Sequence, residues 1–163
     1  MKKRFIIAAV IAAVAGFALH FLFSALPNAV TALFSPVRES VWEHLKLLFW
    51  PSLTAAFVLA PRSEKPQRLW AAFFCALLAM PLFLAGIYYL LLTGFGVSAL
   101  PLDIGLYFLT MFLGFALAYF LYNKCRPEKI GGILLLLLLL YAVCLILFSY
   151  AAPPLEIFSS RRG

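Results

Sequence analysis

The sequence predicts an all-α integral membrane protein with five transmembrane helices. Hydrophobic residues make up 66% of the 163 residues and charged residues only 12%, and the mean hydropathy is +1.05. Soluble domains contain about 45–50% apolar residues. A soluble fold of this size has too small an interior to hide so much apolar surface, whereas lipid solvates it and each helix satisfies its own backbone hydrogen bonds. We therefore expect one helical domain over residues 1–163, with the lipid bilayer as its main partner.

The first apolar run extends from Phe5 to Leu26 and follows the basic residues Lys2, Lys3 and Arg4. A basic segment before an apolar run also describes a signal peptide, whose apolar core is roughly 7–15 residues long. This run is longer, and Ala25-Leu26-Pro27 is a poor cleavage site. We expect a retained first helix at about 5–26, with a cleaved signal peptide as the alternative.

The second helix is expected at about 36–60. Ser35 followed by Pro36 is typical of an N-cap with proline at the first helical position, where its missing N–H costs nothing. The helix opens on charged residues and turns apolar from Leu47 onward. Pro51 lies inside it and is expected to kink it.

Three more apolar runs complete the predicted bundle, at about 69–93, 104–122 and 130–150. The first of them is long enough to cross a bilayer with some tilt. The last contains seven consecutive leucines, at 134–140. Between the runs lie two basic loops, at 61–68 and 123–129, and an uncharged stretch before Asp103.

The basic residues predict the orientation, because short cytoplasmic loops carry an excess of Lys and Arg. Nine of them fall before the first helix or in the two basic loops, namely Lys2, Lys3, Arg4, Arg62, Lys65, Arg68, Lys124, Arg126 and Lys129. The N-terminus is therefore expected to be cytoplasmic, and five helices then place the C-terminus outside. Arg161 and Arg162 in the tail are the exception.

The same distribution argues against nucleic acid as a partner, although the formal charge is +7. The basic residues lie at the ends of apolar runs and form no stripe with interleaved aromatic residues. The sequence leaves two further partners open, a second copy of the chain in a homo-oligomer or another membrane protein.

The only concentrated chemistry is the charged start of the second helix. Ionisable groups in the hydrocarbon are costly, by about 2.5–3.5 kcal/mol each on insertion scales. In a helix from residue 36, Glu39, Glu43 and Lys46 share one face, and Ser40 and His44 form a neighbouring stripe. His20 lies in the outer half of the first helix, so we expect it to meet this segment across the interface between the two helices.

Three interpretations of this segment compete. The plainest is that Glu39 favours the helix N-terminus, Glu43 pairs with Lys46, and the segment lies at the headgroup level. The second is a divalent metal site formed by His20, Glu39, Glu43 and His44, since carboxylate and imidazole groups four residues apart can bind one ion. The third is a proton or ion relay, for which no second repeat supplies a counterpart.

Two classes of function follow from these interpretations. The first is a binding or structural membrane component with a polar Glu/His cluster near the outer face. The alternative is a membrane-embedded enzyme, either metal-dependent or using an acid/base pair, whose candidate catalytic residues are Glu39, Glu43, His44 and Lys46. A relay is the second alternative.

The stretch from Phe34 to Pro51, which includes SPVRESVWEHLKL, resembles a family of small, functionally uncharacterised membrane proteins of mainly Firmicute bacteria, a domain of unknown function with an SPVNESVWEHLKL-like block. Arg38 stands where that block has asparagine. The resemblance implies that Glu39, Trp42, Glu43, His44 and Lys46 belong to the family signature. It also implies a multi-pass protein of a bacterial cell membrane, and it implies no activity.

Overall fold

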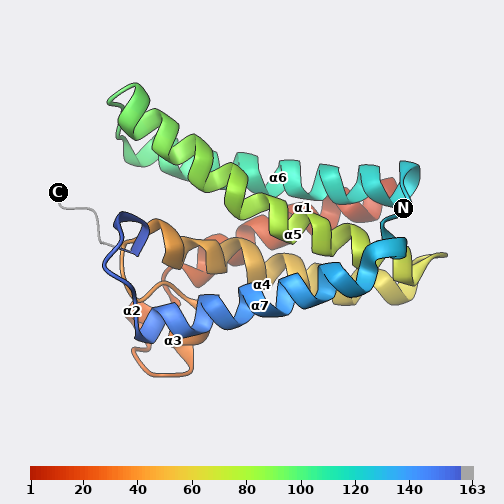
Figure 1. Cartoon of the computed structure of the whole chain (residues 1–163), viewed down its shortest axis with the longest axis horizontal. Coiled ribbons are helices and arrows are strands. Elements are labelled where there is room, and N and C mark those ends of the chain that lie inside the picture. Colours follow the sequence, from red (N-terminus) through yellow and green to blue (C-terminus); the bar gives the residue numbers. More distant parts are fainter. Residues whose placement is uncertain (159–163) are drawn as a thin grey trace.

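The computed structural model describes residues 1–158, and its regular secondary structure there is entirely helical. Arg161 and Arg162, the exception to the basic-residue pattern, lie outside the described residues. Figure 1 shows the long helices side by side, with the N-terminus at one end of the bundle and short helices at the other. The long helices are α1 (Lys2–Leu19), α4 (Val41–Leu59), α5 (Pro66–Tyr89), α6 (Leu100–Lys124) and α7 (Gly131–Tyr150).

Shorter segments connect them. The two short helices α2 (Leu22–Ala25) and α3 (Thr31–Phe34) lead into α4, and η1 (Ala60–Arg62) turns the chain toward α5. A π-helical turn, η2 (Leu90–Gly94), extends α5, η3 (Pro127–Ile130) precedes α7, and η4 (Glu156–Phe158) closes the described chain.

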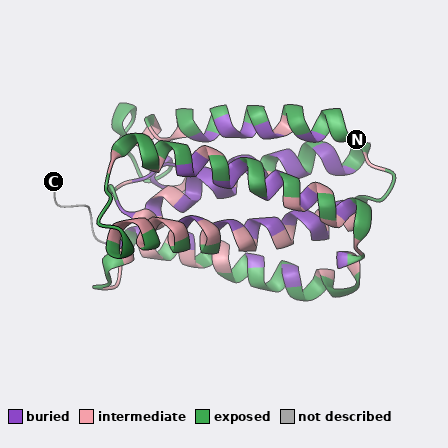
Figure 2. Cartoon of the chain, turned by 90° about the horizontal axis from the view of Figure 1, so that it is seen from above, coloured by how far each residue is buried: buried purple, intermediate pink, exposed green. Residues whose placement is uncertain are grey.

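The outer faces of the bundle are apolar. Leu136 on α7 is 68% exposed and Leu82 on α5 is 77% exposed, and Figure 2 shows exposed residues covering the outward faces while buried ones line the interior. Water penalises an apolar exterior of this extent, whereas a bilayer solvates it. The architecture is therefore that of a membrane protein.

Within residues 1–158, four helical segments, not five, are long and apolar enough to cross a membrane: Lys2–Ala25, Pro66–Gly94, Leu100–Lys124 and Pro127–Tyr150. The prediction of five membrane helices is wrong on this criterion, because α4 does not meet it. Its first turns carry Glu43, His44 and Lys46. Buried residues line much of α4, which packs against α1, α5 and α7. The charged groups of Glu43 and Lys46 are therefore shielded by protein.

The second helix also begins later than expected, at Val41 and not at residue 36. Ser40 is its N-cap, and the Ser40 hydroxyl oxygen accepts the Glu43 backbone N–H at 3.3 Å. Ser35, the expected cap, is fully buried and its Oγ accepts the backbone N–H of Phe23 at 3.1 Å. The Ser35 side chain thus bonds Phe23 and, contrary to the prediction from the sequence, does not cap the helix.

A close approach of three helices occurs at Gly16 on α1. A Cβ atom there would collide with the backbone carbonyl of Leu47 on α4 and with the Tyr107 hydroxyl on α6. That hydroxyl donates a hydrogen bond to the Ala13 carbonyl at 2.9 Å. Because glycine has no side chain, α1 and α4 can approach this closely at Gly16, one turn before His20.

We expect Gly16→Ala to lower the free energy of unfolding by about 1–3 kcal/mol, because overpacking forces the helices apart. Reversible unfolding in mixed micelles measures the change. Gly86→Ala on α5 is the matched control, since a Cβ there meets nothing within 4 Å. Equal stabilities of the two variants would contradict the close approach.

Candidate functional site

The polar end of the bundle is organised by a buried ion pair on α4. Lys46 is fully buried, Glu43 is 3% exposed, and Lys46 Nζ lies 2.8 Å from Glu43 Oε2. Lys46 Nζ also donates to the carbonyls of Ala32 at 2.7 Å and Ser35 at 3.4 Å. An ammonium group has three N–H donors, so all of them have partners.

The same ion pair holds the segment between α1 and α4 in place. Glu43 Oε2 accepts the backbone N–H of Val37 at 3.0 Å. Further down α4, the Trp50 indole N–H donates to the Leu33 carbonyl at 2.9 Å. Glu43 and Lys46 thus share a face of α4 as predicted from their spacing, whereas Glu39 lies before the helix. Together with Trp50, they bind the backbone of residues 32–37.

A second group of side chains lies beside this ion pair, at the junction of α1 with α4. One ligand atom each from His20, Glu39 and His44 lies within 4.8 Å of the other two. His44 Nε2 is 3.4 Å from Glu39 Oε2, and His20 Nε2 is 3.9 Å from Glu39 Oε1. The two imidazole side chains are about two-thirds buried or more, whereas the Glu39 side chain is 70% exposed.

Each of the three residues is positioned by a different element. His20 directly follows the last residue of α1, where the helix is interrupted before α2. Glu39 lies in the bend just before the Ser40 N-cap, and His44 lies in the first turns of α4. The imidazole rings of His20 and His44 are 5.1 Å apart between centroids.

The hydrogen bond of the His44 ring determines which nitrogen faces the group. His44 Nδ1 lies 2.7 Å from the Ser40 carbonyl oxygen. A carbonyl only accepts, so Nδ1 carries the proton and a neutral His44 presents the lone pair of Nε2 toward Glu39. Metal-binding histidines commonly have this arrangement, in which a backbone carbonyl fixes the tautomer.

This tautomer brings two acceptors face to face. The Nε2 lone pair and the Glu39 carboxylate, whose side chain is 70% exposed, face each other across 3.4 Å. A proton, a metal cation or a bridging water molecule between them would relieve their repulsion. The group can therefore bind a cation or hold a proton.

The structure brings three of the four proposed metal ligands together and separates the fourth. Glu43 was expected beside Glu39 on one helical face, but Glu39 precedes the helix and turns toward the two histidines. The carboxylate of Glu43 is bound by Lys46 and Val37 instead. Glu43 and Lys46 are both candidate catalytic residues. They are buried against residues 32–37, whose backbone they bind.

Residues 1–162 match the model of a family of unknown function, DUF6512. The chain belongs to this family. This confirms the expectation that the chain belongs to a family of unknown function. Membership in DUF6512 assigns no activity to the chain. No curated protein and no solved structure matches the chain.

Proposed function

We propose that this protein is a multi-pass membrane protein that binds one divalent transition metal ion through His20, Glu39 and His44. The observation that carries the proposal is the orientation of His44, whose Nε2 lone pair faces a carboxylate across 3.4 Å. A zinc ion between them converts this repulsion into two coordinate bonds.

The spacing of the ligand atoms supports a small tetrahedral ion. Bonds of about 2.0–2.1 Å from zinc to imidazole nitrogen or carboxylate oxygen place tetrahedral ligand atoms about 3.4 Å apart. Glu39 Oε2 lies 3.4 Å from His44 Nε2, and Glu39 Oε1 lies 3.9 Å from His20 Nε2. The Glu39 side chain is exposed and would have to move toward His20 when the ion binds.

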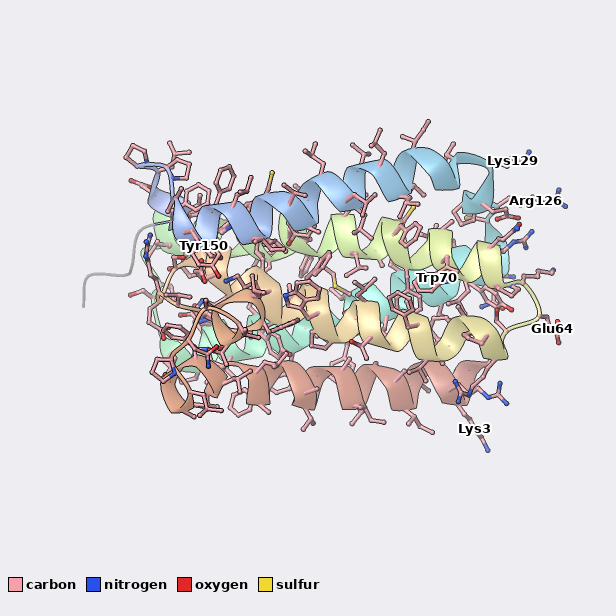
Figure 3. All side chains as sticks on the ribbon, turned by 90° about the horizontal axis from the view of Figure 1, so that it is seen from below. Lys3, Glu64, Trp70, Arg126, Lys129 and Tyr150 are labelled. Carbon is pink, nitrogen blue, oxygen red and sulfur yellow. The ribbon has the colours of Figure 1, made fainter. Side chains whose placement is uncertain are left out.

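The proposal includes the arrangement in the membrane. In this proposal the four apolar segments cross the membrane, and α4 packs against three of the long helices. Lys3, Arg126 and Lys129 gather at the end of the bundle opposite to Tyr150 (Figure 3). The excess of basic residues favours that end as cytoplasmic, which places the metal site toward the outer face of a bacterial cell membrane.

Metal-dependent catalysis is the second candidate function. Three protein ligands leave a fourth position for water, as in catalytic zinc sites, whereas structural sites use four protein ligands. The exposed side of Glu39 would face such a water. The third interpretation is a relay in which a histidine and a glutamate exchange protons while Lys46 balances the charge. It gains no support from Lys46, whose three donors are held by Glu43 and by the carbonyls of Ala32 and Ser35.

The proposed function predicts about one zinc ion per chain after tag-free protein is loaded with zinc and dialysed. Elemental analysis should show that His44→Ala loses this metal, because two remaining ligands bind a divalent ion weakly. Glu64→Gln, at the opposite end of the bundle (Figure 3), is the matched control and should retain it. Equal, negligible metal in the wild type and in His44→Ala would rule the proposal out.

A further inference from the structure

An apolar groove of about 950 Å³ runs along the outside of α1 and α4. Ala8, Ala12 and Ala15 of α1 line one wall and Ala55 and Val58 of α4 line the other. Small alanine side chains recur on the α1 face that lines the groove, and they leave the space beside α4 unfilled. Its size is at the upper end of small-ligand sites.

The groove has a cationic end. Arg4 and Arg62 both line it, and Arg4 Nη1 donates to the Arg62 carbonyl at 3.0 Å. Arg62 Nη1 in turn donates to the Val58 carbonyl at 2.5 Å. Neither guanidinium has a carboxylate within 4.0 Å in the described part of the chain.

The two guanidinium groups, of Arg4 and Arg62, therefore favour the binding of an anion. A guanidinium has five N–H donors, and each of the two uses one for a backbone carbonyl. The remaining donors fit phosphate oxygens, which guanidinium binds with two parallel hydrogen bonds. Phosphate at this position would also relieve the repulsion between the two cations.

We infer that the groove binds an anionic phospholipid, with its phosphate on Arg4 and Arg62 and an acyl chain along α1 and α4. The dimensions agree with this occupant. Half of a hydrocarbon core is about 15 Å thick, and the eleven residue steps from Arg4 to Ala15 rise about 16.5 Å along a helix. One chain anchored at the arginines thus ends near Ala15.

The inference is tested on full-length, delipidated protein by native mass spectrometry. Phosphatidylglycerol and phosphatidylcholine with identical acyl chains are the two probes. We expect the wild type to bind one phosphatidylglycerol in preference to phosphatidylcholine, and Arg4→Gln/Arg62→Gln to weaken phosphatidylglycerol binding about tenfold or more. Lys3→Gln/Lys65→Gln removes the same charge from the same end but outside the groove, and should keep the preference.

A second pair of variants tests the position of the acyl chain. Ala15→Trp fills the groove from an exposed site, since a helical side chain leans toward the helix N-terminus and so toward Arg4. Val14→Trp places the same ring on the neighbouring exposed residue, outside the groove. We expect several-fold weaker phosphatidylglycerol binding in Ala15→Trp only.

Three results would overturn the inference. The first is equal binding of the two lipids by the wild type, and the second is an equal loss in the two glutamine double variants, which would indicate diffuse attraction to basic residues. The third is unchanged binding in Ala15→Trp, which would place the lipid elsewhere. The readout does not involve metal, so its outcome is independent of the proposed function.

Discussion

Replacing Lys46 with methionine should lower the free energy of unfolding by about 3–5 kcal/mol, the cost of leaving a buried charge without its partner. The variant keeps the volume of the side chain but leaves the Glu43 carboxylate enclosed with only the Val37 N–H as donor. It also removes the donor to the carbonyls of Ala32 and Ser35. Reversible unfolding in mixed micelles measures the loss.

The double variant Glu43→Gln/Lys46→Met should recover much of this loss, because a neutral amide is cheaper to bury than an unpaired carboxylate. Lys129→Met, at an exposed residue of the opposite end, controls for the loss of a lysine. The account of the pair fails if Lys46→Met costs no more than Lys129→Met, or if the double variant is as unstable as the sum of its two single changes.

Zinc at about one hundred times its dissociation constant should stabilise the wild type by about 2.7 kcal/mol, because the ion binds only the folded chain. The ligands come from the end of α1 and the start of α4, so the metal connects the two helices across the segment between them. Unfolding in mixed micelles with zinc and with a chelator measures the difference.

His20→Ala and His44→Ala should each abolish the zinc-dependent part of the stability, while Glu64→Gln leaves it unchanged. In chelator, His20→Ala should unfold close to the wild type, since its imidazole is partly exposed and faces an exposed carboxylate. A zinc effect of the same size in all four proteins would show that the ion binds elsewhere.

The helical membrane class was predictable from the sequence because it depends on composition and on the length of apolar runs. The seven consecutive leucines at 134–140 lie in an apolar run of membrane-spanning length, which predicts a helix, and α7 covers them. It was harder to predict from the sequence whether α4 is apolar enough to span a membrane. Its polar groups are tolerated because neighbouring helices and the preceding segment surround them, and that shielding is a tertiary property which hydropathy along the chain does not contain.

The candidate site was predictable in its residues but not in its grouping. The position of His20 relative to the second helix followed from the short connection between neighbouring helices. The separation of Glu39 from Glu43 did not, because it depends on a helix that begins at Val41. Ser40 caps that helix, and Ser35, the expected cap, bonds Phe23, a contact between residues twelve apart. Gly16 was missed for the same reason, since its close neighbours come from two other helices.

X-ray absorption at the zinc edge of the loaded wild-type protein tests whether His20, Glu39 and His44 together bind a divalent metal. We expect nitrogen and oxygen neighbours at about 2.0–2.1 Å, with outer-shell scattering from two imidazole rings. Sulfur neighbours at about 2.3 Å, which would implicate Cys75, Cys125 or Cys144, or a shell without imidazole scattering, would contradict it.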